Sequence, residues 1–181
     1  SLTISNIFMT SPIIIYSTTD GQTLEICEKI FSKLDVSESS KIIHIAKTGE
    51  LDLYQFDKII IGASIRYGKH KPELYEFIQK NVACLEAKEN AFFSVNVVAR
   101  KPEKNTPETN PYMQKFLELS PWNPMKLAVF AGKIDYPKYK FIDKHMIRLI
   151  MWITKGPTDV TNTYEFTNWN TVDEFSKQLN T

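Results

Sequence analysis

The residues best suited to chemistry in this chain form a short polar loop between an apolar run and a helical segment. After Ile13–Tyr16 come the residues of this loop and of the start of the helix, namely Ser17, Thr18, Thr19, Asp20, Gly21, Gln22 and Thr23. Ser and Thr hydroxyls can donate to phosphate oxygens, and the first N–H groups of a helix favour an anion. Gly21 lets the backbone approach a ligand or take an unusual turn. The loop therefore predicts a phosphate site.

Two familiar phosphate-binding patterns are absent from the sequence. It has no GxGxxG and no GxxxxGK[ST], so neither a dinucleotide fingerprint nor a nucleoside-triphosphate loop is predicted. A hydroxyl-rich loop without lysine is typical of a site that holds a phosphate without transferring it. The alternative is an ordinary helix start, with Thr19 or Asp20 as N-cap and nothing bound.

The loop must be positioned by the alternating segments around it. Apolar or β-branched runs predict five strands, at Pro12–Ser17, Lys41–Ala46, Lys58–Ser64, Asn90–Val98 and Lys126–Ile134. Helical spacing of apolar residues predicts helices over Leu24–Leu34, Leu74–Leu85, Pro107–Leu119 and Asn168–Leu179.

This alternation predicts an α/β fold with a doubly wound, five-stranded parallel sheet and helices on both faces. Continuous apolar runs such as Ile59-Ile60-Ile61 fit strands buried on both sides. In such sheets ligands bind at the carboxyl ends of the strands, where the Ser17–Thr23 loop is expected. We expect a tail over residues 1–11, in which Met9 is a possible natural initiator, and one domain over residues 12–181.

Composition narrows the function. The 181 residues carry a net charge of +1, so nothing global indicates nucleic-acid binding. Cys27 and Cys84 suit two free thiols in a reducing cytosol. The three histidines, His44, His70 and His145, are scattered, so we expect no metal site and assign no catalytic base. No apolar run is long enough to span a bilayer, and the first residues do not look like a signal peptide.

The loop resembles the phosphate loop of flavodoxins, which bind FMN with a hydroxyl-rich [ST]-x-x-[GA]-x-T pattern. Thr18, Gly21 and Thr23 match it, and Cys27 stands where that pattern usually has alanine. Three longer stretches are more specific. They are IGASIRYGKH (residues 61–70), SVNVVARKPEKNTPETNPY (94–112) and AGKIDYPKYKFIDKHMIRLIMWITKG (131–156). Together they resemble the flavodoxin-like protoporphyrinogen IX dehydrogenase family of bacterial haem synthesis.

This resemblance implies an oxidoreductase that carries FMN and oxidises protoporphyrinogen IX to protoporphyrin IX. The electrons of this six-electron oxidation would pass to a membrane quinone, menaquinone or ubiquinone. The alternatives are a flavodoxin-type electron carrier and a flavin-dependent quinone reductase fed by NAD(P)H. Ordinary carriers of this kind are usually strongly acidic, so the near-neutral charge disfavours the carrier.

By the same resemblance, two further loops would border the flavin ring. The residues concerned are Ser64, Ile65, Arg66, Tyr67, Gly68, Asn96, Val97, Val98 and Ala99. Candidates for substrate contact are Arg66, Arg100, Lys101 and Tyr136, and the three cations among them suit the propionates of a porphyrinogen. The alternative for the basic residues is an ordinary solvated loop.

The segment 135–162 is the least flavodoxin-like part and is expected to interrupt the fifth strand, which resumes over Thr163–Thr167. From Lys133 to Lys155 it has six Lys or Arg and two Asp, a local charge of +4. A helix over Phe141–Lys155 would place Ile142, Met146, Leu149, Ile150 and Ile153 on one face. Lys144, Arg148, Lys155 and the adjacent Trp152 would lie on the other.

Three uses of this insert remain open. It could contact a membrane interface, with Lys144, Arg148, Trp152 and Lys155 as candidates. It could instead pack its apolar face on the domain, or lid the flavin and form the porphyrinogen pocket. The first use predicts a cytoplasmic protein held peripherally on the inner face of the cell membrane. No oligomeric state is predicted.

Overall fold

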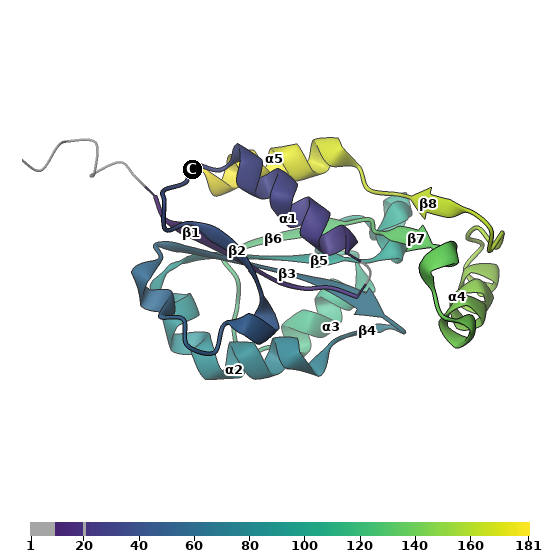
Figure 1. Cartoon of the computed structure of the whole chain (residues 1–181), viewed down its shortest axis with the longest axis horizontal. Coiled ribbons are helices and arrows are strands. Elements are labelled where there is room, and N and C mark those ends of the chain that lie inside the picture. The colour runs from purple at the N-terminus through teal and green to yellow at the C-terminus, as the bar shows by residue number, and fades with distance from the viewer. Residues whose placement is uncertain (1–9, 20) are drawn as a thin grey trace, which may run out of the picture.

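The five predicted strands form one parallel sheet in the computed structural model, which describes residues 10–19 and 21–181. The strands are β1 (Pro12–Ser17), β2 (Lys41–His44), β3 (Lys58–Arg66), β5 (Glu89–Val95) and β6 (Lys126–Phe130), in the order β2-β1-β3-β5-β6 (Figure 1). All four pairings within this order are parallel. The predicted α/β class and sheet are confirmed, whereas Asp20, Met9 and most of the expected tail lie outside the described residues.

Helices cover both faces of the sheet. Helices α1 (Gln22–Lys33) and α5 (Trp169–Leu179) lie on one face, and α2 (Pro72–Ala87) and α3 (Pro111–Leu119) on the other (Figure 1). Alternate strand residues divide between the two cores: Ile14 packs on the α1 and α5 side, and Ile13 and Ile15 on the other. Burial on both faces explains why these strands are continuously apolar.

Several element ends differ from the prediction for local reasons. Strand β2 stops at His44, whose Nδ1 accepts from the N–H of Ala46 at 3.0 Å and turns the chain. Helix α3 begins at Pro111 rather than Pro107, because the side chain of Asn110 caps it by accepting from Tyr112 N at 3.1 Å. Short 3-10 turns occupy Ile45–Lys47, Leu53–Gln55, Val97–Arg100, Pro102–Lys104 and Tyr136–Lys138.

The insert leaves and returns through a separate two-stranded ribbon. Strands β7 (Lys133–Asp135) and β8 (Thr163–Glu165) pair antiparallel, with helix α4 (Phe141–Ile153) between them in sequence (Figure 1). The return strand was predicted, but it does not resume the parallel sheet. The chain must run back alongside its own exit to re-enter the domain, which requires an antiparallel pair.

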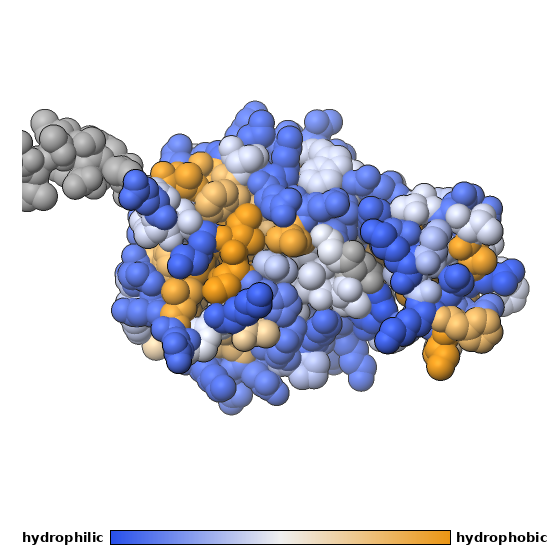
Figure 2. Space-filling model, in the orientation of Figure 1, coloured by the Kyte–Doolittle hydropathy of each residue, from blue (hydrophilic) through white to orange (hydrophobic). Residues whose placement is uncertain are grey.

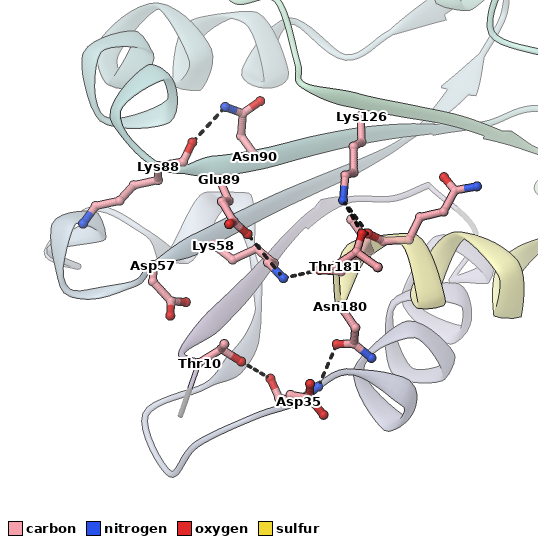
Figure 3. Close-up of polar contacts among 12 residues, drawn as sticks. Thr10, Asp35, Asp57, Lys58, Lys88, Glu89, Asn90, Lys126, Asn180 and Thr181 are labelled. Carbon is pink, nitrogen blue, oxygen red and sulfur yellow. Dashed lines mark hydrogen bonds and ion pairs between the residues drawn. The ribbon is translucent and has the colours of Figure 1, made fainter. Parts of the chain in front are cut away.

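The amino ends of the strands are closed by polar contacts with the end of α5 (Figure 3). The buried Lys58 ammonium donates to the carbonyl of Leu179 and lies 3.5 Å from the Glu89 carboxylate. Lys126 donates to Thr181 Oγ1 at 3.3 Å. Lys126 also donates to the carbonyl of Gln178, so both cations satisfy carbonyl groups at the last turn of the helix, where positive charge is favourable.

Candidate functional site

The polar loop after β1 leads directly into α1. Gly21 is the N-cap residue, with a φ of 88°, and among the described residues no side chain caps the first N–H groups of the helix. A left-handed backbone of this kind favours glycine. The proposed capping role of Thr19 is therefore not observed, and Asp20 lies outside the described residues. The start of α1 keeps N–H groups that can bind an anion.

Three buried polar atoms of this loop and of the first turn of α1 have no hydrogen-bond partner in the described protein. They are Thr19 Oγ1, Thr23 Oγ1 and Gln22 Oε1. Leaving such a group unpaired costs about 1–3 kcal/mol, so most buried polar groups are bonded. The two hydroxyls can donate to phosphate oxygens, and the amide oxygen can accept from a hydroxyl. The loop therefore fits a phosphate ester attached to a polyol chain, as in FMN.

The remaining loop hydroxyls have partners within the protein. Thr18 Oγ1 accepts from Gly21 N at 3.0 Å, which shapes the turn. Ser17 Oγ donates to a carboxylate oxygen of Glu73 at 2.8 Å. Thr18 lines the adjoining cavity, whereas Ser17 is buried beneath it.

One cation beside this loop was missed by the sequence analysis, which treated the loop as lacking lysine. Lys71, which precedes α2, donates from Nζ to the carbonyl of Thr18 at 3.0 Å. Its position next to a predicted helix at the same sheet edge was the available signal. Its charge lies where a phosphate would be stabilised.

Two loops next to the polar loop border an open cavity of about 790 Å³. Strand β3 extends two residues beyond the predicted end and turns back at Tyr67 and Gly68, which have φ values of 53° and 79°. It then pairs with β4 (Lys69–His70), so His70 ends a hairpin. Among the predicted ring-bordering residues, those that line the cavity are Ser64, Ile65, Arg66, Tyr67, Gly68, Asn96, Val97 and Val98. Ala99 is buried behind them.

The insert closes another side of the same cavity, as one of its three expected uses requires. Its lining residues come from the ribbon, from α4 and from the turn between them, and the sequence analysis named none of them as cavity residues. They are Lys133, Ile134, Tyr139, Ile147, Ile150 and Met151. Tyr112 of α3 also lines the cavity and was not assigned. No local pattern marks these residues, because their role depends on where the insert folds back.

Arginines from the two ring-bordering loops hold the two ends of α4. Arg66 lies 3.6 Å from the Asp143 carboxylate, which also accepts from the Tyr67 hydroxyl. Arg100 donates to the carbonyl of Thr154 at 3.1 Å, and burial lowers its pKa. Both arginines were candidates for substrate contact. In the structure, each contacts the insert.

The other two substrate candidates lie away from the cavity wall. Tyr136 is fully buried within the insert and donates its hydroxyl to the carbonyl of Pro157 at 2.7 Å. Lys101 is half-buried between two 3-10 turns. Neither residue is among those that line the cavity.

A buried polar chain supports both ring-bordering loops from below. His70 Nε2 is 2.9 Å from Ser94 Oγ, which accepts from Asn96 Nδ2 at 3.2 Å. Asn110 Nδ2 in turn donates to Asn96 Oδ1 at 2.9 Å. Burial lowers the pKa of His70 to about 4, so it is neutral at physiological pH. The chain links β4, β5, the following loop and the start of α3.

Comparison with known proteins places the chain in a family. Residues 13–161 match the flavodoxin domain family. The chain is 40% identical over 168 residues to the protoporphyrinogen IX dehydrogenase [quinone] of Escherichia coli (strain K12), covering 92% of this chain and 93% of that protein. The chain belongs to the protoporphyrinogen IX dehydrogenase family.

Relatives in this family extend beyond bacteria. The protoporphyrinogen IX dehydrogenase [quinone] of Leishmania major is 39% identical over 169 residues, covering 92% of this chain and 73% of that protein. Among solved structures, oxidised flavodoxin 1 from Bacillus cereus aligns with a TM-score of 0.46 and 17% identity, covering 76% of this chain and 91% of that one.

The described residues offer no alternative metal centre. Within residues 10–19 and 21–181, no three His, Cys, Asp or Glu side chains are grouped so that they could hold a metal ion. The candidate site consists of the Ser17–Thr23 loop, the two loops that border the cavity and the covering insert.

Proposed function

We propose that this protein binds FMN and oxidises protoporphyrinogen IX to protoporphyrin IX, with a quinone as electron acceptor. The hydroxyls of Thr19 and Thr23, which have no partner among the described residues at the start of α1, support the phosphate end of this proposal. The relatives, named protoporphyrinogen IX dehydrogenase [quinone], support the reaction. The flavin supplies the redox chemistry, and the protein binds and orients it.

Different loops at the carboxyl edge of the sheet hold different parts of the cofactor. Thr18, Thr19, Gly21 and Thr23 hold the phosphate, with the Lys71 cation behind them. Gln22 is fixed by donating to Thr167 Oγ1 at 2.8 Å, so its free amide oxygen accepts from the ribityl chain. The two ring-bordering loops hold the isoalloxazine, and the insert excludes water above it.

FMN rather than FAD fits this arrangement. One short hydroxyl-rich loop serves a monophosphate, and the sequence has no second pyrophosphate signature. Mass analysis of the released flavin should find stoichiometric FMN. Stoichiometric FAD would overturn the assignment.

The insert also provides a surface for a membrane. Only part of α4 packs inward: Met151 is buried, and Ile147 and Ile150 are half-buried. The exposed apolar side chains of α4 are Phe141, Ile142, Met146, Leu149, Trp152 and Ile153. Figure 2 shows apolar surface on the insert at the end of the molecule remote from the start of β1. None of the helices in the described residues combines the length and apolar composition required to cross a bilayer.

We propose that the exposed apolar surface of α4 makes peripheral contact with a membrane. Such contact would hold the protein at the inner face of the cell membrane, where its quinone dissolves. Arg148 and Lys155 are exposed and Lys144 half-buried, and each cation near an anionic leaflet contributes about 1 kcal/mol. Ile142→Ser with Ile153→Ser should reduce co-sedimentation with anionic vesicles, and Val36→Ser on the main domain is the matched control. Equal sedimentation of all three proteins would reject the contact.

The activity is tested by supplying protoporphyrinogen IX and a quinone to the FMN-loaded protein without oxygen. Porphyrin fluorescence should appear in proportion to quinol. If quinone is reduced only when NAD(P)H is present and no porphyrin forms, the reductase alternative replaces this function. If the protein turns over neither protoporphyrinogen IX nor quinone, the electron-carrier alternative replaces this function.

A further inference from the structure

A second cavity adjoins the flavin cavity on the side of the sheet covered by α2 and α3. It has a volume of about 1160 Å³ and opens to solvent between the β3–β4 hairpin and these two helices. Ile65, Gly68 and Tyr112 line both cavities, so the wall between them is about one residue thick. Gly68 has no side chain, and a β-carbon placed there would lie 4.0 Å from Tyr112 Cε1.

The lining of this second cavity is mainly apolar and aromatic. Tyr75 and Tyr112 form aromatic sides, and the buried, neutral His70 lies between the flavin loops and this space. Burial raises the pKa of both tyrosines, so their hydroxyls keep their protons and can donate hydrogen bonds. Leu119, 54% exposed, supplies an apolar edge toward solvent.

The charges around the cavity are nearly balanced. Lys69 and Lys115 are opposed by Glu76, and Lys115 also lies 3.6 Å from Glu118. A dianionic tetrapyrrole would gain little favourable electrostatic interaction from such a lining. The cations of the insert would stabilise its two negative charges better. A neutral, flat ring with hydrogen-bond acceptors matches apolar walls and two phenol donors.

We propose that this second cavity binds the quinone ring, with the hydroxyl groups of Tyr75 and Tyr112 directed to its carbonyl oxygens and Leu119 at the mouth beside its apolar tail. The inference rests on the proposed function, since it assigns a place to the acceptor of that reaction. It also separates the two half-reactions, with the tetrapyrrole on the insert side of the flavin.

A wall between the second cavity and the flavin is compatible with the quinone, which accepts electrons, but not with the protoporphyrinogen, which donates hydride. Hydride transfer requires reacting atoms about 3–3.5 Å apart, whereas electrons can cross a thin wall. Two electrons move from the reduced flavin onto the quinone, and each carbonyl oxygen takes one proton from solvent. The quinone leaves as the quinol, and the protons of the reduced flavin return to solvent.

The test measures the two half-reactions separately in FMN-loaded protein, together with direct binding of a tail-less quinone, 2-methyl-1,4-naphthoquinone, by calorimetry. Tyr75→Phe keeps the ring and removes one donor, so it should weaken quinone binding about three- to tenfold. Leu119→Trp should narrow the mouth and slow reoxidation about tenfold. Tyr54→Phe and Met125→Trp, at exposed positions outside this cavity, are the controls.

Reduction of the flavin by protoporphyrinogen IX should be unchanged in both test variants. Unchanged quinone affinity and reoxidation in Tyr75→Phe and Leu119→Trp would overturn the site. A loss confined to flavin reduction would assign the cavity to the tetrapyrrole instead. If protoporphyrinogen IX fails to reduce the wild-type protein, the proposed function fails, while the calorimetric result still decides where a quinone binds.

Discussion

The two ends of the parallel sheet satisfy their buried polar groups in different ways. At the amino end, Lys58 bonds the last turn of α5, and Asn180 Oδ1 accepts from Asp35 N at 3.0 Å (Figure 3). At the carboxyl end, the Thr19 and Thr23 hydroxyls are buried without a partner in the described residues. The amino end is bonded within the chain at these positions, whereas the proposed function assigns the two hydroxyls at the carboxyl end to a phosphate.

Under the proposed function, this difference marks the place where the protein gives up stability for binding. A buried hydroxyl without a partner costs about 1–3 kcal/mol in the free protein, and a bound phosphate would restore that free energy. Substitutions at the two ends should therefore separate folding from flavin affinity.

The largest effect is expected from Thr19→Val with Thr23→Val. Hydrogen bonds to a charged group are worth about 1.5–3 kcal/mol each, so FMN affinity should fall roughly 10²- to 10⁴-fold. The flavin-free protein should be as stable as wild type or more so, since two unpaired hydroxyls are removed. Fluorescence titration and urea unfolding measure both, with Thr171→Val on α5 as control. Destabilisation without loss of affinity would contradict the comparison.

The second effect is a pH dependence from His70. Its pKa is lowered from 6.5 to about 4, so the unfolded chain binds more protons between these values. Stability should therefore be full above about pH 6.5 and fall by roughly 3 kcal/mol as the pH drops to about 4. His70→Gln cannot titrate and should flatten this part of the profile. If the same pH dependence of stability persists in this variant, groups other than His70 cause it.

The third effect tests the amino end. Lys58→Met leaves the Leu179 carbonyl without its donor and should cost about 1–3 kcal/mol of unfolding free energy in urea. FMN affinity should not change, because the substitution lies at the opposite end of β3 from the site. The exposed Lys80→Met is the control. A large loss of affinity would show that the two ends are coupled.

The smallest effect concerns the turn before α1. Gly21 has a φ of 88° with open space around it, so Gly21→Ala should cost about 1 kcal/mol through backbone strain alone. Gly49→Ala also meets no neighbour, and Gly49 has no positive φ, so it should be neutral. Equal unfolding free energies for the two variants would contradict the claim that the backbone at Gly21 is strained for other residues.

The sequence predicted the sheet well because its signals are local. Uninterrupted apolar runs such as Ile13–Ile15 mark strands buried on both faces, and their order along the chain implies parallel pairing. The position of the hydroxyl-rich loop at the carboxyl end of β1 was also predictable, because it follows a strand and opens a helix, whereas its binding of a phosphate stays a prediction.

The covering of the site could not be predicted in the same way. Arg66 and Arg100 look like free cations in the sequence, and only the folded insert shows that they contact Asp143 and Thr154. Lys71 contacts the carbonyl of Thr18, which lies 53 residues earlier in the chain. The return of β8 beside β7, rather than into the main sheet, is likewise a tertiary result.

The most direct test of the account compares FMN with riboflavin, which lacks the phosphate, in wild type and in Thr19→Val with Thr23→Val. Wild type should bind FMN much more tightly than riboflavin, and the variant should lose roughly 10²-fold or more of that preference. Riboflavin affinity should stay within about twofold, because the ring-bordering loops are untouched. An equal loss for both ligands would contradict the claim that this loop holds the phosphate.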